Sequence, residues 1–277
     1  MCLGISDATS ERIGSPTCDL NLAFNVDPTG APSTRRWGRL TLASLGVNRR
    51  TRIARVQRRE KVLTPIALYG AEGSGSVAVE AALTLLDIPY SLLEGATWTE
   101  ESARERVAPH NPMRQVPTLV LPGGEVMTES AAILLYLADA YPKAHLAPTA
   151  TEQLRRPFLR WMFYVSSAIY SLHWIKPDVR RVGAPLELKE TVVNAVHDRI
   201  AYCWSNMDAQ LEPGRYLLGD EITVLDLYVT VVSRFGPWRT RFYEVAPKMA
   251  PAVRRVDAEP RLTEFWARRF PFGEGWE

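Results

Sequence analysis

The stretch "NPMRQVPTLVLPGGEVMTESAAILLYLADAYP", residues 111–142, contains the features that decide the fold. Its short apolar run, residues 118–121, lies between a Val-Pro pair and a Thr-Glu-Ser sequence. The residue before a proline favours extended backbone, and a proline that starts a strand leaves part of a backbone edge unpaired. The Pro-Gly-Gly turn predicts a hairpin, and the Ser and Thr residues predict the start of a helix.

The flanking sequence extends this pattern. Apolar runs predict further strands at 66–70 and 89–94, and helical spacing predicts helices at 77–87, 99–107 and 129–141. The order of these segments predicts one mixed four-stranded sheet, in which the first two strands are parallel and joined by a right-handed crossover. Beyond residue 142, helical patterns predominate, at 154–170, 186–211, 224–235 and in a last stretch that ends near 269.

The chain has 277 residues, which is enough for two domains. Residues 1–60 hold ten Arg, no Lys and five acidic residues, so they carry +5; because the whole chain carries +2, the remainder carries −3. We predict an irregular basic extension at 1–62, an α/β domain at 63–143 and an all-helical domain at 149–277. The extension is interpreted as disordered, as weakly helical or as lying upstream of the start codon that the cell uses. A targeting leader and an RNA- or membrane-binding tail are the alternatives.

Composition argues against several classes of protein. The three cysteines, Cys2, Cys18 and Cys203, lack metal-like spacing, which disfavours a zinc site or a disulfide framework and fits a reducing compartment. No apolar run reaches the ~18 residues of a membrane span. The first residues lack a positive leader followed by an apolar block, so we expect no secretory signal. We therefore expect a cytoplasmic protein with no metal and with no nucleic-acid or membrane partner.

The two ends of the quoted stretch also predict a ligand. An extended peptide can pair with an open backbone edge at Val116 as an added strand. The unpaired N–H groups at the start of the helix near residue 129 attract a carboxylate, assisted by the helix dipole. Together these features predict a receptor for a small peptide with a free carboxylate.

At this point the chain resembles a known family. "NPMRQVPTLVL" and "MTESAAILLYLADAY" are similar to the glutathione-binding half of the glutathione S-transferases. "LYGAEGSGSVAVEAALTLLDIPY" (68–90) resembles their first strand, active-site turn and first helix, and "LLGDEITVLDLYV" (217–229) resembles the capping motif of their helical domain. The resemblance covers about residues 64–270. It implies a thioredoxin-like α/β domain followed by an all-α helical bundle domain, with glutathione, γ-Glu-Cys-Gly, bound between them.

The resemblance also implies roles for individual residues. Val116 would bind the cysteinyl backbone of glutathione, with Pro117 in cis, and Gln115 would lie near the ligand. Ser130 would hold the γ-glutamyl carboxylate, and Glu129 would face the α-amino group. Alternatively, Pro117 serves only the fold of a thioredoxin-like domain, and Ser130 is only a helix cap.

Members of the family react through the glutathione thiolate. A free thiol has a pKa near ~8.5, so the neutral form predominates at pH 7 unless a donor stabilises the thiolate. A hydroxyl at the start of the first helix can be this donor. We expect Ser74 to take this role, with Ser76 as the second candidate. Alternatively, both are turn residues and backbone N–H groups alone hold the thiolate. The turn has no cysteine, which disfavours thiol–disulfide chemistry by the protein.

The helical domain should supply a pocket for the second substrate. Trp161, Tyr164 and Tyr170 are the candidate lining residues, although aromatic residues at helical spacing are more often part of a core. "ITVLDL" predicts a capping box in which Thr223 is the N-cap and Asp226 has a structural role.

We therefore predict a homodimeric glutathione transferase that uses glutathione as co-substrate and a small electrophilic molecule as second substrate. The alternatives are a glutathione-binding protein of the same fold with a regulatory, non-catalytic role, and a glutathione-dependent isomerase or disulfide reductase.

Overall fold

A computed structural model describes residues 65–273, so the predictions for residues 1–62 lie outside the described residues. Its strands are β1 (Ile66–Gly70), β2 (Tyr90–Glu94), β3 (Thr118–Val120) and β4 (Val126–Met127). The α-helices are α1 (Ser76–Leu85), α2 (Glu101–Val107), α3 (Ser130–Ala140), α4 (Arg155–Tyr164), α5 (Lys189–Gln210), α6 (Val224–Val232), α7 (Trp238–Val245), α8 (Ala250–Asp257) and α9 (Thr263–Arg269). Shorter helical turns are η1 (Pro142–Ala144), η2 (Val165–Ile169), η3 (Tyr170–Trp174), η4 (Val179–Val182) and η5 (Leu186–Leu188).

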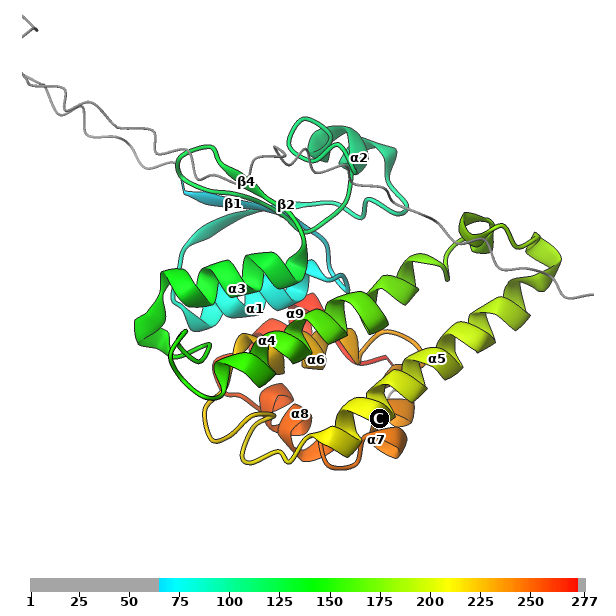
Figure 1. Cartoon of the computed structure of the whole chain (residues 1–277). Coiled ribbons are helices and arrows are strands. Elements are labelled where there is room, and N and C mark those ends of the chain that lie inside the picture. Colours follow the sequence, from blue (N-terminus) through cyan, green and yellow to red (C-terminus); the bar gives the residue numbers. More distant parts are fainter. Residues whose placement is uncertain (1–64, 274–277) are drawn as a thin grey trace, which may run out of the picture. The chain divides into compact units, whose positions relative to one another are not determined.

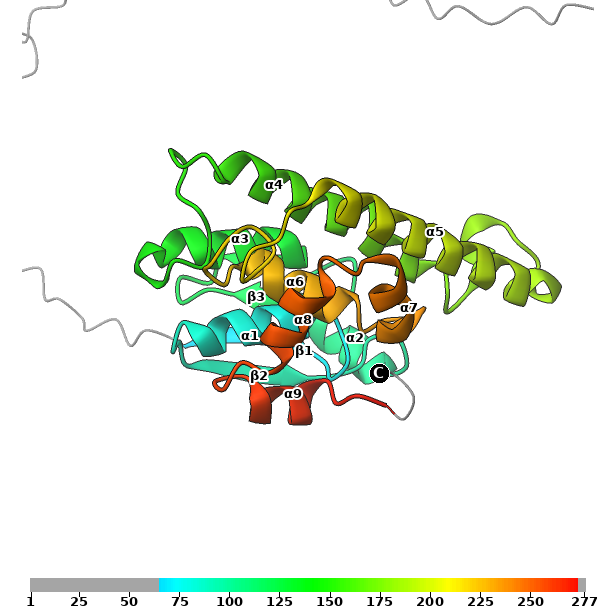
Figure 2. The same cartoon turned by 90° about the horizontal axis from the view of Figure 1, so that it is seen from below.

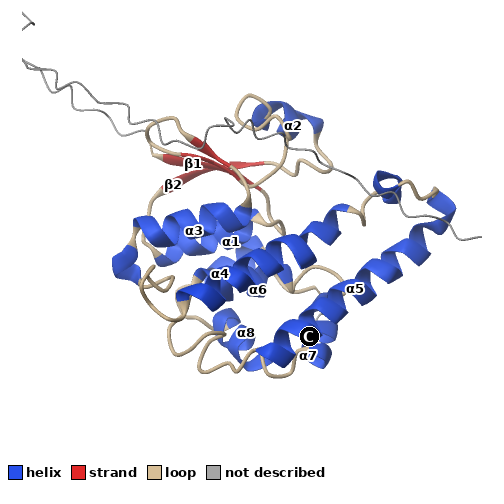
Figure 3. Cartoon of the chain, in the orientation of Figure 1, coloured by secondary structure: helices blue, strands red, loops and turns tan. Residues whose placement is uncertain are grey.

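The four strands form one sheet in the order β2-β1-β3-β4. β1 is parallel to β2, and it is antiparallel to β3, with Leu68 opposite Leu119. β3 and β4 form an antiparallel hairpin across the Pro-Gly-Gly turn. The predicted mixed sheet, its parallel first unit and its hairpin are therefore confirmed. Figure 3 shows these strands together in the upper part of the view, and after β4 the described elements are all helices and helical turns.

Helices cover both faces of the sheet. α1 and α3 lie on one face, and α2 lies on the other (Figure 1). α1 contacts the sheet, α3 and α6, so it is buried on all sides. This placement explains its sequence, "SVAVEAALTL", because a helix with no solvent-facing side has no need of a polar face.

One hydrophobic core continues from the sheet into the helical half. α6 lies at its centre and contacts α1, α3, α4 and α8, as Figure 2 shows from below. The division into separate domains at 143–149 stays a prediction. Within residues 65–273, no helix combines the length and the apolar character needed to cross a bilayer.

The segment predicted as one helix at 154–170 is a regular α-helix only in its first half. The α-helix ends at Tyr164 and continues as the π-helical turn η2 and the 3₁₀ turn η3. Two serine hydroxyls donate to backbone carbonyls here: Ser167 to Phe163, and Ser171 to Ser167. Such hydroxyl bonds to the preceding turn often accompany bends in helices, because they compete with the regular backbone pattern.

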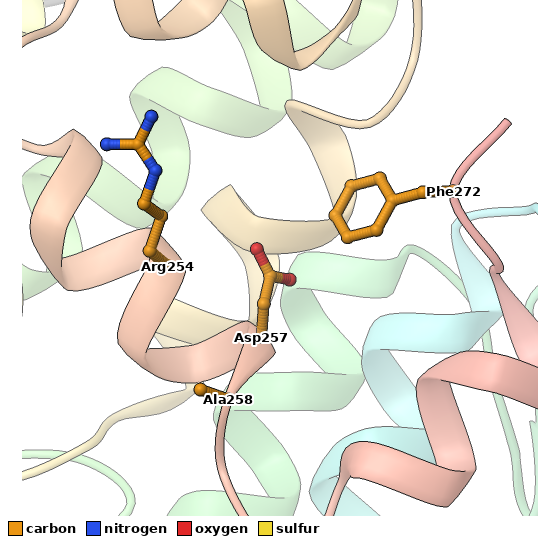
Figure 4. A pocket seen from close by; sticks show the side chains of 4 residues that line it. All are labelled: Arg254, Asp257, Ala258 and Phe272. Atoms are coloured by element: carbon orange, nitrogen blue, oxygen red, sulfur yellow. The ribbon is translucent and has the colours of Figure 1, made fainter. Parts of the chain in front are cut away.

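Two buried arginines tie the C-terminal segment to the helical core. The guanidinium groups of Arg234 and Arg239 are fully buried, and each donates to Asp257 at 2.6 Å. The ring of Phe272 lies 4.2 Å from the Arg234 guanidinium carbon. Figure 4 shows Asp257 and Phe272 on either side of a cavity of about 410 Å³. None of the residues predicted to form a site lines this cavity.

The predicted capping box at the start of α6 is confirmed. The Thr223 backbone N–H and hydroxyl donate to the same Asp226 carboxylate oxygen, at 2.9 and 2.7 Å. The other oxygen accepts the backbone N–H of Leu217 at 2.8 Å. Asp226 is almost fully buried, so it has a structural role in fixing the most buried helix to the preceding loop.

We expect Asp226→Ala to lower the free energy of unfolding by about 2–4 kcal/mol, because it leaves two buried backbone N–H groups without an acceptor. Denaturant unfolding followed by circular dichroism measures this loss. The matched control is Asp220→Ala, in the same loop but exposed, which should change stability by less than about 0.5 kcal/mol. Equal stability of the two variants would contradict this role for Asp226.

Candidate functional site

A cavity of about 830 Å³ collects most of the predicted site residues. Its wall includes Ser74, Gln115, Val116, Pro117, Glu129, Ser130 and Tyr170. The chain brings them together from the turn before α1, the loop before β3, the start of α3 and the turn η3. Ser76, Trp161 and Tyr164 do not lie on this wall.

The backbone at Val116 forms an open edge in the cavity. The Val116–Pro117 bond is cis. Within residues 65–273, no hydrogen bond is made to the backbone N–H or C=O of Val116. The preceding residue is held firmly, because the Gln115 carbonyl accepts the Thr118 hydroxyl at 2.8 Å and the Asn111 side-chain amide at 3.1 Å. The result is a fixed edge with one unpaired donor and one unpaired acceptor, which an extended ligand backbone can satisfy.

The start of α3 provides the second binding element. Glu129, the N-cap, has φ of 64°, a conformation that residues other than glycine rarely adopt. Such conformations cluster at ligand sites, where the surrounding structure maintains them. Ser130 begins the helix, and its hydroxyl lies 3.1 Å from the hydroxyl of Tyr228 on α6. The first N–H groups of α3 lack intrahelical acceptors, and the helix dipole favours an anion beside them.

Ser74 and Ser76 have different positions. Ser74 lies on the cavity wall, whereas Ser76 is fully buried beneath it. The two hydroxyl oxygens are 2.8 Å apart, and the Ser76 backbone N–H donates to the Ser74 oxygen at 3.1 Å. The Ser76 hydroxyl is 2.9 Å from the Glu80 carboxylate and also accepts the Ala71 N–H. Ser76 therefore positions Ser74, and Ser74 is the hydroxyl that a ligand in the cavity can reach.

Sequence analysis missed the acidic residue that supports these serines. Glu80 is fully buried in α1, and Arg269 on α9 holds it at 2.7 Å. Arg269 also pairs with Glu94 at 2.8 Å, and its carbonyl accepts the N–H of Gly73. Burial raises the pKa of Glu80 despite the nearby guanidinium and the Ser76 hydroxyl. In the sequence, Glu80 is the single acidic residue of a mostly apolar helix, which could have indicated its role. Arg269, 189 residues further along the chain, stands in no pattern that identifies it as the partner.

Of the three aromatic residues predicted to line the second-substrate pocket, one lies on the cavity wall and two do not. Tyr170 lies on the wall, and a Cβ at Gly75 would overlap its hydroxyl, so the glycine lets this tyrosine approach the turn before α1. Trp161 and Tyr164, both on α4, instead pack edge to face with their ring centroids 5.3 Å apart. The Tyr164 hydroxyl donates to the Cys203 carbonyl at 3.1 Å, which turns the ring toward α5. Trp161 is almost fully buried in the hydrophobic core.

Comparison with known proteins places this geometry in context. Residues 68–145 match the family model described as "Glutathione S-transferase, N-terminal domain". The chain is 33% identical over 206 residues to the GST-like protein YncG of Escherichia coli K12, covering 73% of this chain and 98% of that protein. It is 30% identical over 154 residues to glutathione S-transferase GstA of Escherichia coli O157:H7, covering 56% of this chain and 73% of that protein.

A solved structure shows the same fold. It is that of a glutathione transferase homologue from Sulfitobacter with bound glutathione, and it superimposes with a TM-score of 0.65 at 25% identity. The match covers 73% of this chain and 96% of that one.

We expect Arg269→Met to lower the free energy of unfolding by about 3 kcal/mol at pH 7, because it leaves the buried Glu80 carboxylate without its cation. The pKa of Glu80 is already raised above its ordinary 4.5 in the folded chain, so its protonated form favours folding. Stability of the variant should therefore fall more steeply than that of the wild type as pH rises above 4.5.

Chemical denaturation at a series of pH values measures this difference. Arg268→Met is the matched control, since Arg268 is the exposed neighbour on α9 and should have little effect at any pH. A loss at Arg269 that is independent of pH would contradict the role assigned to Glu80.

Proposed function

Because the chain belongs to the glutathione S-transferase family, we propose that it is a glutathione transferase that binds the tripeptide in the cavity described above. The single observation that carries this proposal is the open backbone edge of Val116 on the same cavity wall as the first turn of α3. The cysteinyl backbone pairs with Val116. The γ-glutamyl carboxylate binds Ser130 and the unpaired N–H groups of α3, and Glu129 binds the α-amino group.

In this proposal the reaction begins with the thiol of glutathione. The thiol loses its proton to solvent, and the thiolate accepts a hydrogen bond from the Ser74 hydroxyl. The Ser76 N–H donates to the Ser74 oxygen and fixes its position, and the Ser74 proton turns from the Ser76 hydroxyl oxygen, 2.8 Å away, toward the sulfur when glutathione binds. The thiolate then attacks an electrophilic carbon in the remaining part of the cavity; the sulfur–carbon bond forms as the bond from that carbon to the leaving group breaks, and the leaving group departs to solvent as an anion.

A second donor lies beside the same turn. Burial raises the pKa of Tyr170, so this hydroxyl stays protonated and can donate to the thiolate. Ser74 takes the principal role in our proposal, because it lies on the cavity wall in the turn from which α1 starts, where the helix dipole adds to the stabilisation.

Glutathione binding without turnover is the second candidate function. It is favoured by the near-complete burial of Ser74, whose exposed fraction is 6%, and by its bond to Ser76, which can occupy its proton. The family relationship also supports our proposals of a cytoplasmic homodimer and of a small electrophilic molecule as the second partner.

We expect Ser74→Ala to reduce kcat/KM for conjugation of a chromogenic electrophile about tenfold to a hundredfold at neutral pH, while glutathione still binds. The pKa of the bound thiol, read from thiolate absorbance in the ultraviolet, should rise in this variant. Tyr170→Phe is the matched control and should retain most of the activity. Full activity in Ser74→Ala with loss in Tyr170→Phe would transfer the role to the tyrosine. Glutathione binding with no turnover in the wild type would favour the second candidate.

A further inference from the structure

One end of the cavity carries an unbalanced positive charge. We call it the basic end and define it by Lys176 and Arg181, with the aromatic rings of Trp174, Phe235 and Trp238 around them. The charged residues of the whole cavity wall are Arg104, Arg114, Glu129, Lys176 and Arg181. Four are cations and one is an anion, and the anion lies at the start of α3, where the proposed function assigns it to glutathione.

The four cations differ in their partners. Arg104 pairs with Glu101 at 3.0 Å, and Arg114 lies 3.3 Å from Glu105. Within residues 65–273, neither Lys176 nor Arg181 forms an ion pair. The Lys176 ammonium donates to the Gly236 carbonyl at 2.9 Å, and Arg181 donates to the Trp174 carbonyl at 2.6 Å. The hydrogen bonds of both cations at the basic end are therefore made to neutral carbonyl groups. Arg181 also interacts at longer range with Asp178, whose carboxylate pairs with Arg180 at 2.8 Å.

The surroundings of Lys176 supply no hidden counter-ion. A Cβ at Gly236 would lie 2.9 Å from the Lys176 ammonium and 3.0 Å from the His197 ring, so the two side chains converge on this glycine. Burial lowers the pKa of His173 to about 3, so its ring is uncharged at neutral pH, and both its nitrogens lack hydrogen-bond partners. Burial lowers the pKa of Lys176 to about 8, so the amine is still mostly charged at pH 7.

A partly buried cation without a counter-ion is costly, and an anionic ligand would remove this cost. The carrier of that anion should be apolar and flat, because aromatic rings form the remainder of the basic end. Phe235 stacks on Tyr170 with ring centroids 5.7 Å apart, and the rings of Trp174 and Trp238 are each nearly half exposed. These rings can pack against an aromatic body while the two cations bind its charge.

We propose that the second substrate is an aromatic electrophile that bears a carboxylate, and that Lys176 and Arg181 bind this carboxylate at the basic end of the cavity. The inference rests on the proposed function, since it assigns a ligand to the part of the cavity that glutathione would leave free. It goes beyond that function by naming the charge and the shape of the partner molecule.

Two preformed glutathione conjugates provide the test, because their binding requires no turnover. One is made from chlorodinitrobenzoate with its carboxylate para to the chloride, and the other from the methyl ester of that compound. In each synthesis the thiolate sulfur forms a bond to the ring carbon, and chloride leaves. The two conjugates share the glutathione part and the ring, so their difference in affinity reports on the carboxylate alone.

We expect the wild-type protein to bind the acid conjugate at least about tenfold more tightly than the ester, as measured by titration calorimetry at pH 7. Lys176→Met should reduce this preference to about twofold or less with little change for the ester. Arg181→Met should reduce it in part, and as an exposed position it provides a second variant if Lys176→Met folds poorly. Lys189→Met is the matched control, since Lys189 is exposed and does not line the cavity.

Reduced glutathione is titrated in parallel to separate the two proposals. If glutathione and both conjugates bind but acid and ester bind equally, the inference is wrong and the proposed function stands. If the preference for the acid survives in both Lys176→Met and Arg181→Met, the assignment of these residues is wrong. If neither glutathione nor either conjugate binds to the folded protein, the proposed function fails and the inference fails with it.

Discussion

The backbone of Val116 is the feature on which the proposed chemistry depends. Its N–H and C=O find no partner in residues 65–273, although the carbonyl of the preceding residue, Gln115, accepts two hydrogen bonds. A backbone group left unpaired near the protein interior costs free energy, unless water or a ligand satisfies it. The cavity beside it offers the place for such a ligand, and the unpaired N–H groups at the start of α3 set the charge that the ligand should carry at one end.

Helix α1 connects this site to the rest of the molecule. It is buried between the sheet and α6, yet it contains Glu80, whose carboxylate bonds Ser76 and through it holds Ser74 at the cavity wall. Arg269 brings α9 to the same carboxylate, and its carbonyl holds the turn that contains Ser74 through Gly73. Helix α9 thus fixes the geometry of the turn. We therefore expect substitutions in α9 to alter the environment of the bound thiol, even though α9 does not line the cavity.

The sequence predicted features that depend on local chemistry. The Pro-Gly-Gly turn, the apolar runs and the Thr223–Asp226 capping box lie within a few residues of their partners, and each was confirmed. Features set by distant packing could not be predicted. The π-helical turn after Tyr164 and the pairing of Glu80 with Arg269 belong to this group. So does the basic end of the cavity, because the lack of a counter-ion for Lys176 becomes visible only when all neighbours are in place.

Titration calorimetry with reduced glutathione and with the dipeptide Cys-Gly tests the central claim most directly. The dipeptide keeps the backbone that would pair with Val116 but lacks the γ-glutamyl carboxylate that would bind at α3. Our account predicts saturable binding of one glutathione per chain and at least about tenfold weaker binding of the dipeptide. Equal affinity for the two peptides, or no binding of glutathione by folded protein, would contradict the account.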